Sequence, residues 1–499
     1  MLLFFRMDEQ TSLPDSRRAE EERVQARSSV FKKELGLRDL IFTQIVFVVG
    51  TSWVGTAAKL GPSQTVYWLL AILLFYLPVA AVVIYLNRIM PLEGGLYQWA
   101  KFGFNDFAGF MVAWNLWLLG IVVMAGTGLV VATNISYAIG PSAAWMPTSK
   151  AFVSILNGAL IAALILVTIR GLSLGKWVHN VGALLLLATY AALVALPFFA
   201  RVHGALPQYR PVEWVMPTAS LFSLNIFSKM ALGALSGFEY VAILAGETRA
   251  PGRNIGRSVM LAAPIIALMF ILGTSSVMAY VQFKDIDLIG PVPQVLSLGF
   301  RDFGIGSTIA SIAILMLLGR QIALLSIYFT GNTRLPMVAG WDHILPAWFT
   351  RLQPRHKTPV NSILFVGAIT LAFALASLIG VGRQEAFQLI DNAAGIFYAI
   401  AYLVLFAIPI CGSKHLARRA PLWLRLSAMA GFLVTLLYIV LTIFPIVEVQ
   451  SRFSFAAKII IVTVAANLIG ALIFAQGERR RRSASHRLGP HPLPRSDHE

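Results

Sequence analysis

The chain has 499 residues, of which 57% are hydrophobic and only 13% are charged. Soluble domains carry about 25% charged residues, so this composition excludes an ordinary water-soluble globular protein. The formal net charge of +17 does not indicate nucleic acid as a partner, because the basic residues gather at the termini and in alternate short loops, as membrane orientation requires.

Long apolar runs recur over residues 37–476, each near the 20 residues or so that cross a bilayer. In lipid only helices or closed barrels satisfy the backbone, and these runs lack period-2 alternation. They predict an all-α, polytopic membrane protein of about twelve transmembrane helices, with spans at 39–58, 65–87, 105–137, 151–170, 175–199, 222–248, 255–281, 305–331, 360–380, 387–411, 422–445 and 454–476.

Polar tails flank the apolar region. Residues 1–36 predict a partly disordered N-terminal tail, and residues 477–499, which contain the run Arg479–Arg482, predict a basic C-terminal tail. Lys and Arg are more frequent in the loops on the side of these tails. The positive-inside rule then predicts a multi-pass protein of a cell inner membrane with both termini cytoplasmic.

Two predicted helices carry residues that weaken a helix near its middle. Span one contains Gly50 and Gly55, and span six contains Gly233 and Gly237; a serine or threonine lies beside each pair. Glycine weakens a helix interior, and hydroxyl groups can bond a freed backbone. Breaks at corresponding places of two halves are typical of transporter binding sites. The candidate substrate-binding residues are Gly50, Thr51, Ser52, Trp53, Gly55, Thr56, Gly233, Ala234, Leu235, Ser236, Gly237 and Phe238.

A broken helix exposes N–H groups on one half and carbonyls on the other. N–H ends near Thr56 and Glu239 would hold a carboxylate, and carbonyl ends near Gly50 and Gly233 would hold an ammonium group. A zwitterionic amino acid satisfies both. The alternative is that the small residues only allow helices to pack closely.

Lys229, Glu239, Arg320 and Asp391 are charged residues inside predicted spans, where a charge costs on the order of 2.5–3.5 kcal/mol at mid-membrane. Glu239 is either a proton-linked switch or a structural carboxylate that bridges the break. Arg320 either faces Glu239 or the cavity, or pairs with another helix or a carbonyl. Lys229 lines an outer vestibule or snorkels, and Asp391 caps span ten or lies in a shallow outer cavity. The excess of Lys229 and Arg320 over Glu239 favours an acidic or neutral substrate.

Three motifs together resemble the amino acid–polyamine–organocation superfamily of amino acid permeases. They are residues 233–239 with 245–255, residues 91–97 running to Trp114, and residues 332–336 followed by Leu345-Pro346 and Thr358-Pro359. The resemblance implies a leucine-transporter-type fold with two inverted five-helix repeats, at about 37–200 and 218–411, and two extra helices at about 421–476. It also implies alternating access and uptake coupled to protons or another ion, or exchange.

Three positions depart from the family pattern. A Gly-Ser-Gly sequence of helix one corresponds to Gly55-Thr56-Ala57 here. An aromatic residue that often gates the site in helix six is replaced by Gly233, which implies either a roomier pocket or closure by another ring such as Trp53. A coupling lysine within helix five is absent, since the span carries only Lys176 at its start.

The sequence therefore predicts a secondary transporter of amino acids or related amines, with the substrate, a coupling ion and the lipid bilayer as partners. Two alternatives are a nutrient sensor that keeps the site without transport, and a channel. A phosphate loop, a metal-binding helix and a nucleophile elbow are all missing, and Cys411 is the single cysteine. No enzymatic activity, cofactor or metal is expected.

Overall fold

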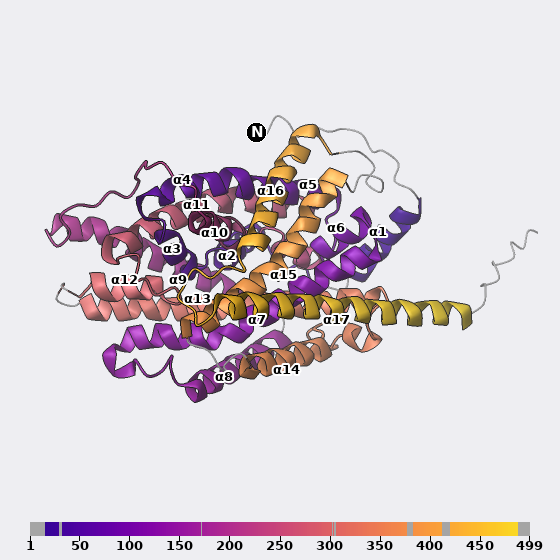
Figure 1. Cartoon of the computed structure of the whole chain (residues 1–499). Helices are drawn as coiled ribbons and strands as arrows, with labels where there is room; N and C mark the ends of the chain where they lie inside the picture. The colour runs from indigo at the N-terminus through magenta and orange to yellow at the C-terminus, as the bar shows by residue number, and fades with distance from the viewer. Residues whose placement is uncertain are drawn as a thin grey trace, which may run out of the picture.

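The computed structural model describes residues 15–28, 32–170, 172–301, 303, 306–376, 383–411 and 420–487. These residues form helices, joined by short connections (Figure 1). The longer helices are α1 (Asp15–Ser28), α2 (Leu37–Val48), α3 (Thr51–Ala58), α4 (Gln64–Ala71), α5 (Leu77–Ile89), α6 (Leu96–Gly103), α7 (Asp106–Ile139), α8 (Lys150–Ile169), α9 (Leu172–Val202), α10 (Leu221–Ser228), α11 (Pro251–Tyr280), α12 (Pro291–Gly299), α13 (Gly306–Trp341), α14 (Val360–Ala376), α15 (Arg383–Cys411), α16 (Leu422–Leu441) and α17 (Arg452–Arg487).

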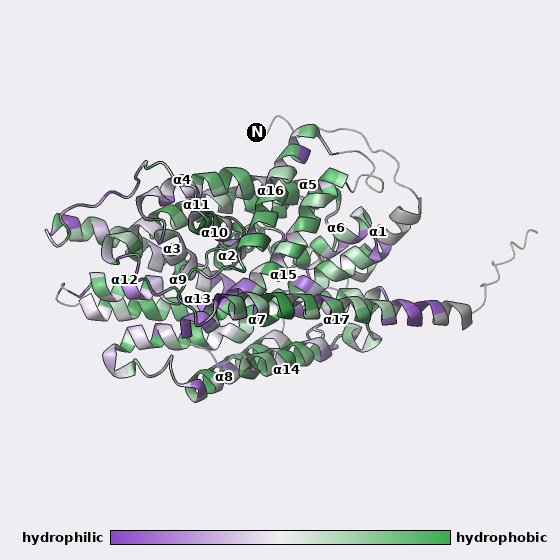
Figure 2. Cartoon of the chain, viewed as in Figure 1, coloured by the Kyte–Doolittle hydropathy of each residue, from purple (hydrophilic) through white to green (hydrophobic). Residues whose placement is uncertain are grey.

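Within the described residues, nine helices are long and apolar enough to cross a membrane, and the bent pair α2–α3 makes a tenth. Two shorter apolar helices, Leu221–Ala234 and Val360–Leu375, lie where the sequence predicts spans six and nine. Apolar residues cover most of the bundle, and hydrophilic ones gather at the end of α17 (Figure 2). The predicted polytopic all-α class is therefore confirmed.

The tails differ from the sequence prediction. Part of the predicted N-terminal tail forms α1, whose Val24 is buried. The basic run Arg479–Arg482 continues α17 beyond the predicted boundary at 476. There Arg481 pairs with Asp106 of α7 and with Glu478 one turn earlier in α17. Residues 488–499 lie outside the described part of the chain.

The helices that surround the centre of the bundle come from distant parts of the sequence. The long helix α13 packs against α7 and α9, and α15 packs against α7 and α16. Helix α11 packs against α2 and α5. Helix α12 lies at one end of the bundle, whereas α1, α6 and the end of α17 lie at the other (Figure 1). The interrupted helices, α2–α3 and the segment from α10 to the 3-10 helix η6 (Tyr240–Glu247), are thereby enclosed by long, continuous ones.

Candidate functional site

The first predicted span is broken at Val49 and Gly50, where α2 and α3 meet with a bend of 45°. The carbonyls at the end of α2 have no partner within the helix. Arg320 of α13 supplies one: its Nη2 lies 3.1 Å from the Val46 carbonyl oxygen and 2.5 Å from that of Val49. The buried guanidinium thus holds the carbonyl end of the break, which is the favourable end for a positive charge.

The position of this break corrects one part of the sequence prediction. The N–H end was expected near Thr56, but Thr56 lies inside α3 and its hydroxyl donates to the Ser52 carbonyl oxygen at 3.3 Å. The N–H groups of Thr51 and Ser52 begin the helix instead. Of the partners predicted for Arg320, the structure shows the carbonyls of helix one and the cavity. Glu239 is bound by Tyr398 and Tyr402 instead.

The sixth predicted span is interrupted over a longer stretch. A π-helical turn, η5 (Lys229–Ala234), follows α10, and the 3-10 helix η6 (Tyr240–Glu247) begins after Glu239. Gly237 has a φ of +128°, a value that favours glycine. Its N–H donates to the Tyr402 hydroxyl at 2.9 Å.

Two tyrosines of α15 hold the Glu239 carboxylate. The hydroxyls of Tyr398 and Tyr402 each donate to one of its oxygens, and Glu239 is fully buried. These tyrosines were missed by the sequence analysis. Their spacing of four residues, which places two side chains on one helix face, is the signal that could have found them.

Trp53 joins the two breaks. A Cβ atom added at Gly50 would lie 2.5 Å from Trp53 Cδ1, and one added at Gly233 would lie 2.3 Å from Trp53 Cη2. The indole ring therefore occupies the space next to both glycines. This is the arrangement expected if Trp53 takes the place of an aromatic residue at position 233.

A cavity of about 160 Å³ lies beside the breaks, among α2–α3, α7, η5, α13 and α15. An engineered cavity of about 150 Å³ holds benzene, so this one is large enough for a small organic molecule. Of the predicted site residues, those that line it are Gly50, Thr51, Ser52, Trp53, Gly233, Ser236 and Arg320. Gly55, Thr56, Ala234, Leu235, Gly237, Phe238 and Glu239 are not part of its lining.

Two further charged residues lie close to the cavity. Lys229 is only 1% exposed, and its ammonium group donates to Asn392 Oδ1 and, at 3.0 Å, to Thr442 Oγ1. It neither snorkels nor lines the cavity. Asp391, predicted as a cap or a shallow outer residue, lies in the third turn of α15 and does line it.

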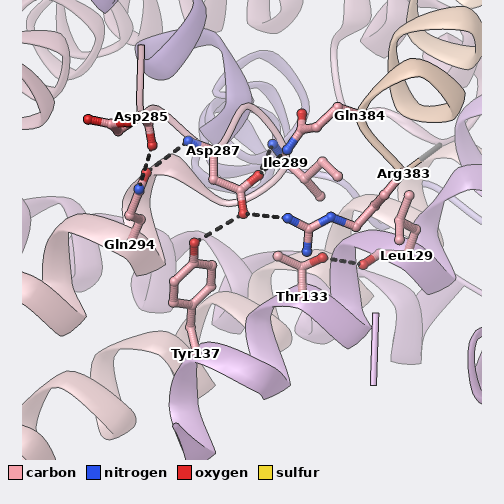
Figure 3. A network of polar contacts seen from close by, with 9 residues as sticks. All are labelled: Leu129, Thr133, Tyr137, Asp285, Asp287, Ile289, Gln294, Arg383 and Gln384. Atoms are coloured by element: carbon pink, nitrogen blue, oxygen red, sulfur yellow. Dashed lines mark hydrogen bonds and ion pairs between the residues drawn. The ribbon is translucent and has the colours of Figure 1, made fainter. Parts of the chain in front are cut away.

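The connection between α11 and α12 crosses one end of the site, and Asp287 fixes it there (Figure 3). Asp287 accepts from Gln384 at 2.7 Å and from Tyr137 at 3.1 Å, and Arg383 lies 3.5 Å away. The Ile289 N–H also donates to Asp287 at 3.0 Å, and the Ile289 side chain lines the cavity. The same short segment thus forms both a polar contact and part of the cavity wall.

The segment before α2, which contains Glu34 and Leu35, covers the end of the bundle opposite to Asp287. The N–H groups of Glu34 and Leu35 both donate to the Glu247 carbonyl oxygen at 3.0 Å. The Glu247 side chain pairs with Arg334, and Glu93 accepts from the Gly246 N–H at 2.5 Å. Burial, reinforced by the nearby Glu247 carboxylate, raises the pKa of Glu93 to about 8 although Arg334 acts in the other direction.

Comparison with known proteins identifies the family to which this chain belongs. The amino acid permease family model matches residues 35–466. The chain belongs to the amino acid permease family. This permease is 23% identical to "Aspartate/glutamate permease AcaP" of Lactococcus lactis subsp. cremoris over 457 residues, which cover 87% of this chain and 93% of that protein. It is 20% identical to "Probable agmatine/putrescine antiporter AguD" of Lactococcus lactis subsp. lactis over 379 residues, or 75% and 78% of the two chains.

A solved structure supports the fold of the permease. The crystal structure of MhsT in complex with L-phenylalanine aligns with a TM-score of 0.60 and 13% identity, over 81% of this chain and 97% of that one. The permease therefore has the leucine-transporter-type fold expected from the sequence resemblance. It is a multi-pass membrane transporter of an amino acid and amine permease family, and not an enzyme.

Proposed function

We propose that this permease is a secondary active transporter that carries amino acids or related amines by alternating access. The observation that carries the proposal is the meeting of two interrupted helices beside one cavity, with Trp53 packed against both. Freed backbone groups recognise a small zwitterion or amine in such an arrangement. The Thr51 and Ser52 N–H groups at the start of α3 suit a substrate carboxylate.

The route of the substrate follows from the two ends of the site. We propose the two inverted repeats, at about 37–200 and 218–411, as the units that move. Both termini are cytoplasmic in this proposal, so Asp287 lies on the outer side and the segment around Glu34 on the inner side. One set of contacts must open while the other stays shut, so that the cavity faces each side in turn.

Coupling to protons or exchange of one solute for another would drive net movement. Glu239 is the proposed coupling group, because it bridges the break in helix six to α15 through Tyr398 and Tyr402. Glu239→Gln should abolish the dependence of uptake on pH. Uptake by this variant with an unchanged pH profile would remove Glu239 from the coupling mechanism.

Counterflow in proteoliposomes tests the transport function itself. Vesicles loaded with an unlabelled amino acid or amine should accumulate the same labelled solute transiently, and empty vesicles should not. Binding of the solute without counterflow would instead indicate a sensor. Flux that does not saturate with solute concentration would indicate a channel.

A further inference from the structure

Three of the four charged side chains at the centre of the permease have partners within the protein. Arg320 donates to the carbonyls of Val46 and Val49 and to Gln321. Lys229 donates to Asn392 and Thr442, and Glu239 accepts from two tyrosines. These charged groups stabilise the helix breaks and the packing of α15 through the hydrogen bonds named above. The excess of cations in the sequence therefore does not indicate the charge of the substrate.

Asp391 differs from these three, because its described interaction with an opposite charge is through space and not a direct contact. It lines the cavity and is half-buried, and among the residues that the structure describes no group donates a hydrogen bond to it or forms an ion pair with it. Lys229 is close enough to attract the Asp391 carboxylate electrostatically, but its described hydrogen bonds go to Asn392 and Thr442. A carboxylate in the membrane interior is costly without a partner, and a buried charge is normally paired.

The position of Asp391 defines what that partner can be. Thr51 and Ser52 at the start of α3 line the same cavity as Asp391 of α15. A substrate whose carboxylate or amine lies at the helix breaks can therefore extend a second polar group toward α15. A positively charged group of the substrate could bind the Asp391 carboxylate directly, which Lys229 does not do in this structure.

We propose that Asp391 binds the distal cationic group of the substrate, so that the permease selects dibasic amino acids or diamines. This proposal rests on the transport function proposed above and specifies its substrate class. Ammonium and guanidinium groups both form charge-assisted hydrogen bonds with a carboxylate. The sequence alone favoured an acidic or neutral substrate, whereas this proposal favours a cationic one.

The test is uptake by proteoliposomes of labelled arginine, lysine and putrescine, compared with leucine and glutamate. The dibasic solutes should be taken up with at least tenfold higher kcat/KM. Asp391→Asn should reduce that advantage tenfold or more, and Asp391→Glu should restore part of it. Glu385→Gln, a buried carboxylate of α15 outside the cavity lining, is the matched control and should leave the selectivity unchanged.

The outcomes separate this inference from the proposed function. Uptake of leucine or glutamate without uptake of any dibasic solute would overturn the inference and leave transport standing. No uptake of any of the solutes would overturn both. Equal selectivity in wild type and Asp391→Asn would remove Asp391 from recognition.

A measurement on the unmodified permease covers the case in which Asp391→Asn fails to fold. Arginine and citrulline have nearly the same shape, but only arginine carries a side-chain charge. Arginine should raise the unfolding temperature of the wild-type permease in detergent more than citrulline at the same concentration. An equal rise with both ligands would contradict the proposal.

Discussion

At the scale of single residues, the site depends on two glycines that leave room for a neighbouring ring. Gly50 and Gly233 provide the space for one indole ring, and Trp53 fills it. The glycines thus serve two purposes, since they also weaken their helices at the breaks. A side chain at either position would have to displace the ring.

Gly233→Ala should destabilise the permease and slow transport. The added methyl would overlap the Trp53 ring, and overpacking of this kind costs about 1–3 kcal/mol. Thermal unfolding and uptake measure the two effects. Trp53→Phe in the same chain should relieve the overlap and recover stability. Gly158→Ala, where the nearest atom would be 3.8 Å from the new Cβ, is a control that should change little.

The residues of the site were only partly predictable from the sequence. The glycine, serine and threonine residues beside the breaks could be found, because their types reveal a weak helix. The sequence offered a carbonyl as one possible partner of Arg320, but which carbonyls it binds, and the role of Tyr402, depend on which helix face meets which neighbour. Asp391 was noticed as a charge, but its location in the cavity wall follows from the rotation of α15.

At the scale of elements, the break in helix one depends on a partner from another helix. Its carbonyl end is held by Arg320 of α13, at a sequence separation that no local pattern reveals. The sequence predicted that helix one breaks but placed its N–H end about one turn too late. Glycine indicates where a helix can break, whereas the tertiary hydrogen bonds decide where it does.

Arg320→Met should destabilise the permease by about 1.5–3 kcal/mol, the range for hydrogen bonds to charged groups. The change leaves the Val46 and Val49 carbonyls without donors in an apolar interior. Unfolding of the purified protein in detergent measures the loss. Arg257→Met, at an exposed position of α11, is the control, and equal stability of the two variants would contradict the role of Arg320.

The apolar elements themselves were predictable because the bilayer imposes a length and a composition on each span. Spans six and nine were found from their apolar runs although their helices are short in the structure. The polar end of α17 was missed, because arginines after an apolar run resemble the end of a span. The structure shows that the helix continues past them.

At the scale of the whole molecule, the cavity lies between two sets of polar contacts at opposite ends of the bundle. The contacts of Asp287 involve α7, the α11–α12 connection and α15. The contacts of Glu247 involve η6, α13 and the segment before α2. In the alternating access proposed above, the two sets of contacts break at different times.

Asp287→Asn should loosen the end of the bundle at α12. An asparagine cannot pair with Arg383 as a carboxylate does, so this end should open more often. With the single native thiol removed (Cys411→Ser) and Thr127→Cys as a reporter in the cavity, a membrane-impermeant thiol reagent added from that side should react several-fold faster.

The control for this experiment is Asp285→Asn, because Asp285 contributes its backbone carbonyl to the same network and its side chain points away from Asp287 (Figure 3). Labelling should then proceed at the unmodified rate. Equal rates in the Asp287 and Asp285 variants would show that the carboxylate does not hold this end shut.

Glu93, at the end of the bundle where Glu247 pairs with Arg334, should make the stability of the permease depend on pH. The folded-state pKa of Glu93 is raised from an ordinary value of 4.5 to about 8. Between these two pKa values the folded state therefore binds more protons than the unfolded state. The contribution of Glu93 to the free energy of unfolding falls as the pH rises from about 5 through 8. The unfolding temperature should fall over that range, and Glu93→Gln should flatten the change. A Glu93→Gln curve parallel to wild type would contradict this assignment.

The indole that touches both glycines also constrains how such proteins can diverge. Position 53 belongs to the first interrupted helix and position 233 to the second, yet one volume is divided between them. A relative that gained bulk at 233 would have to lose it at 53 in compensation. These two sites should therefore covary among homologous permeases, and the ring between the two breaks can come from either interrupted helix.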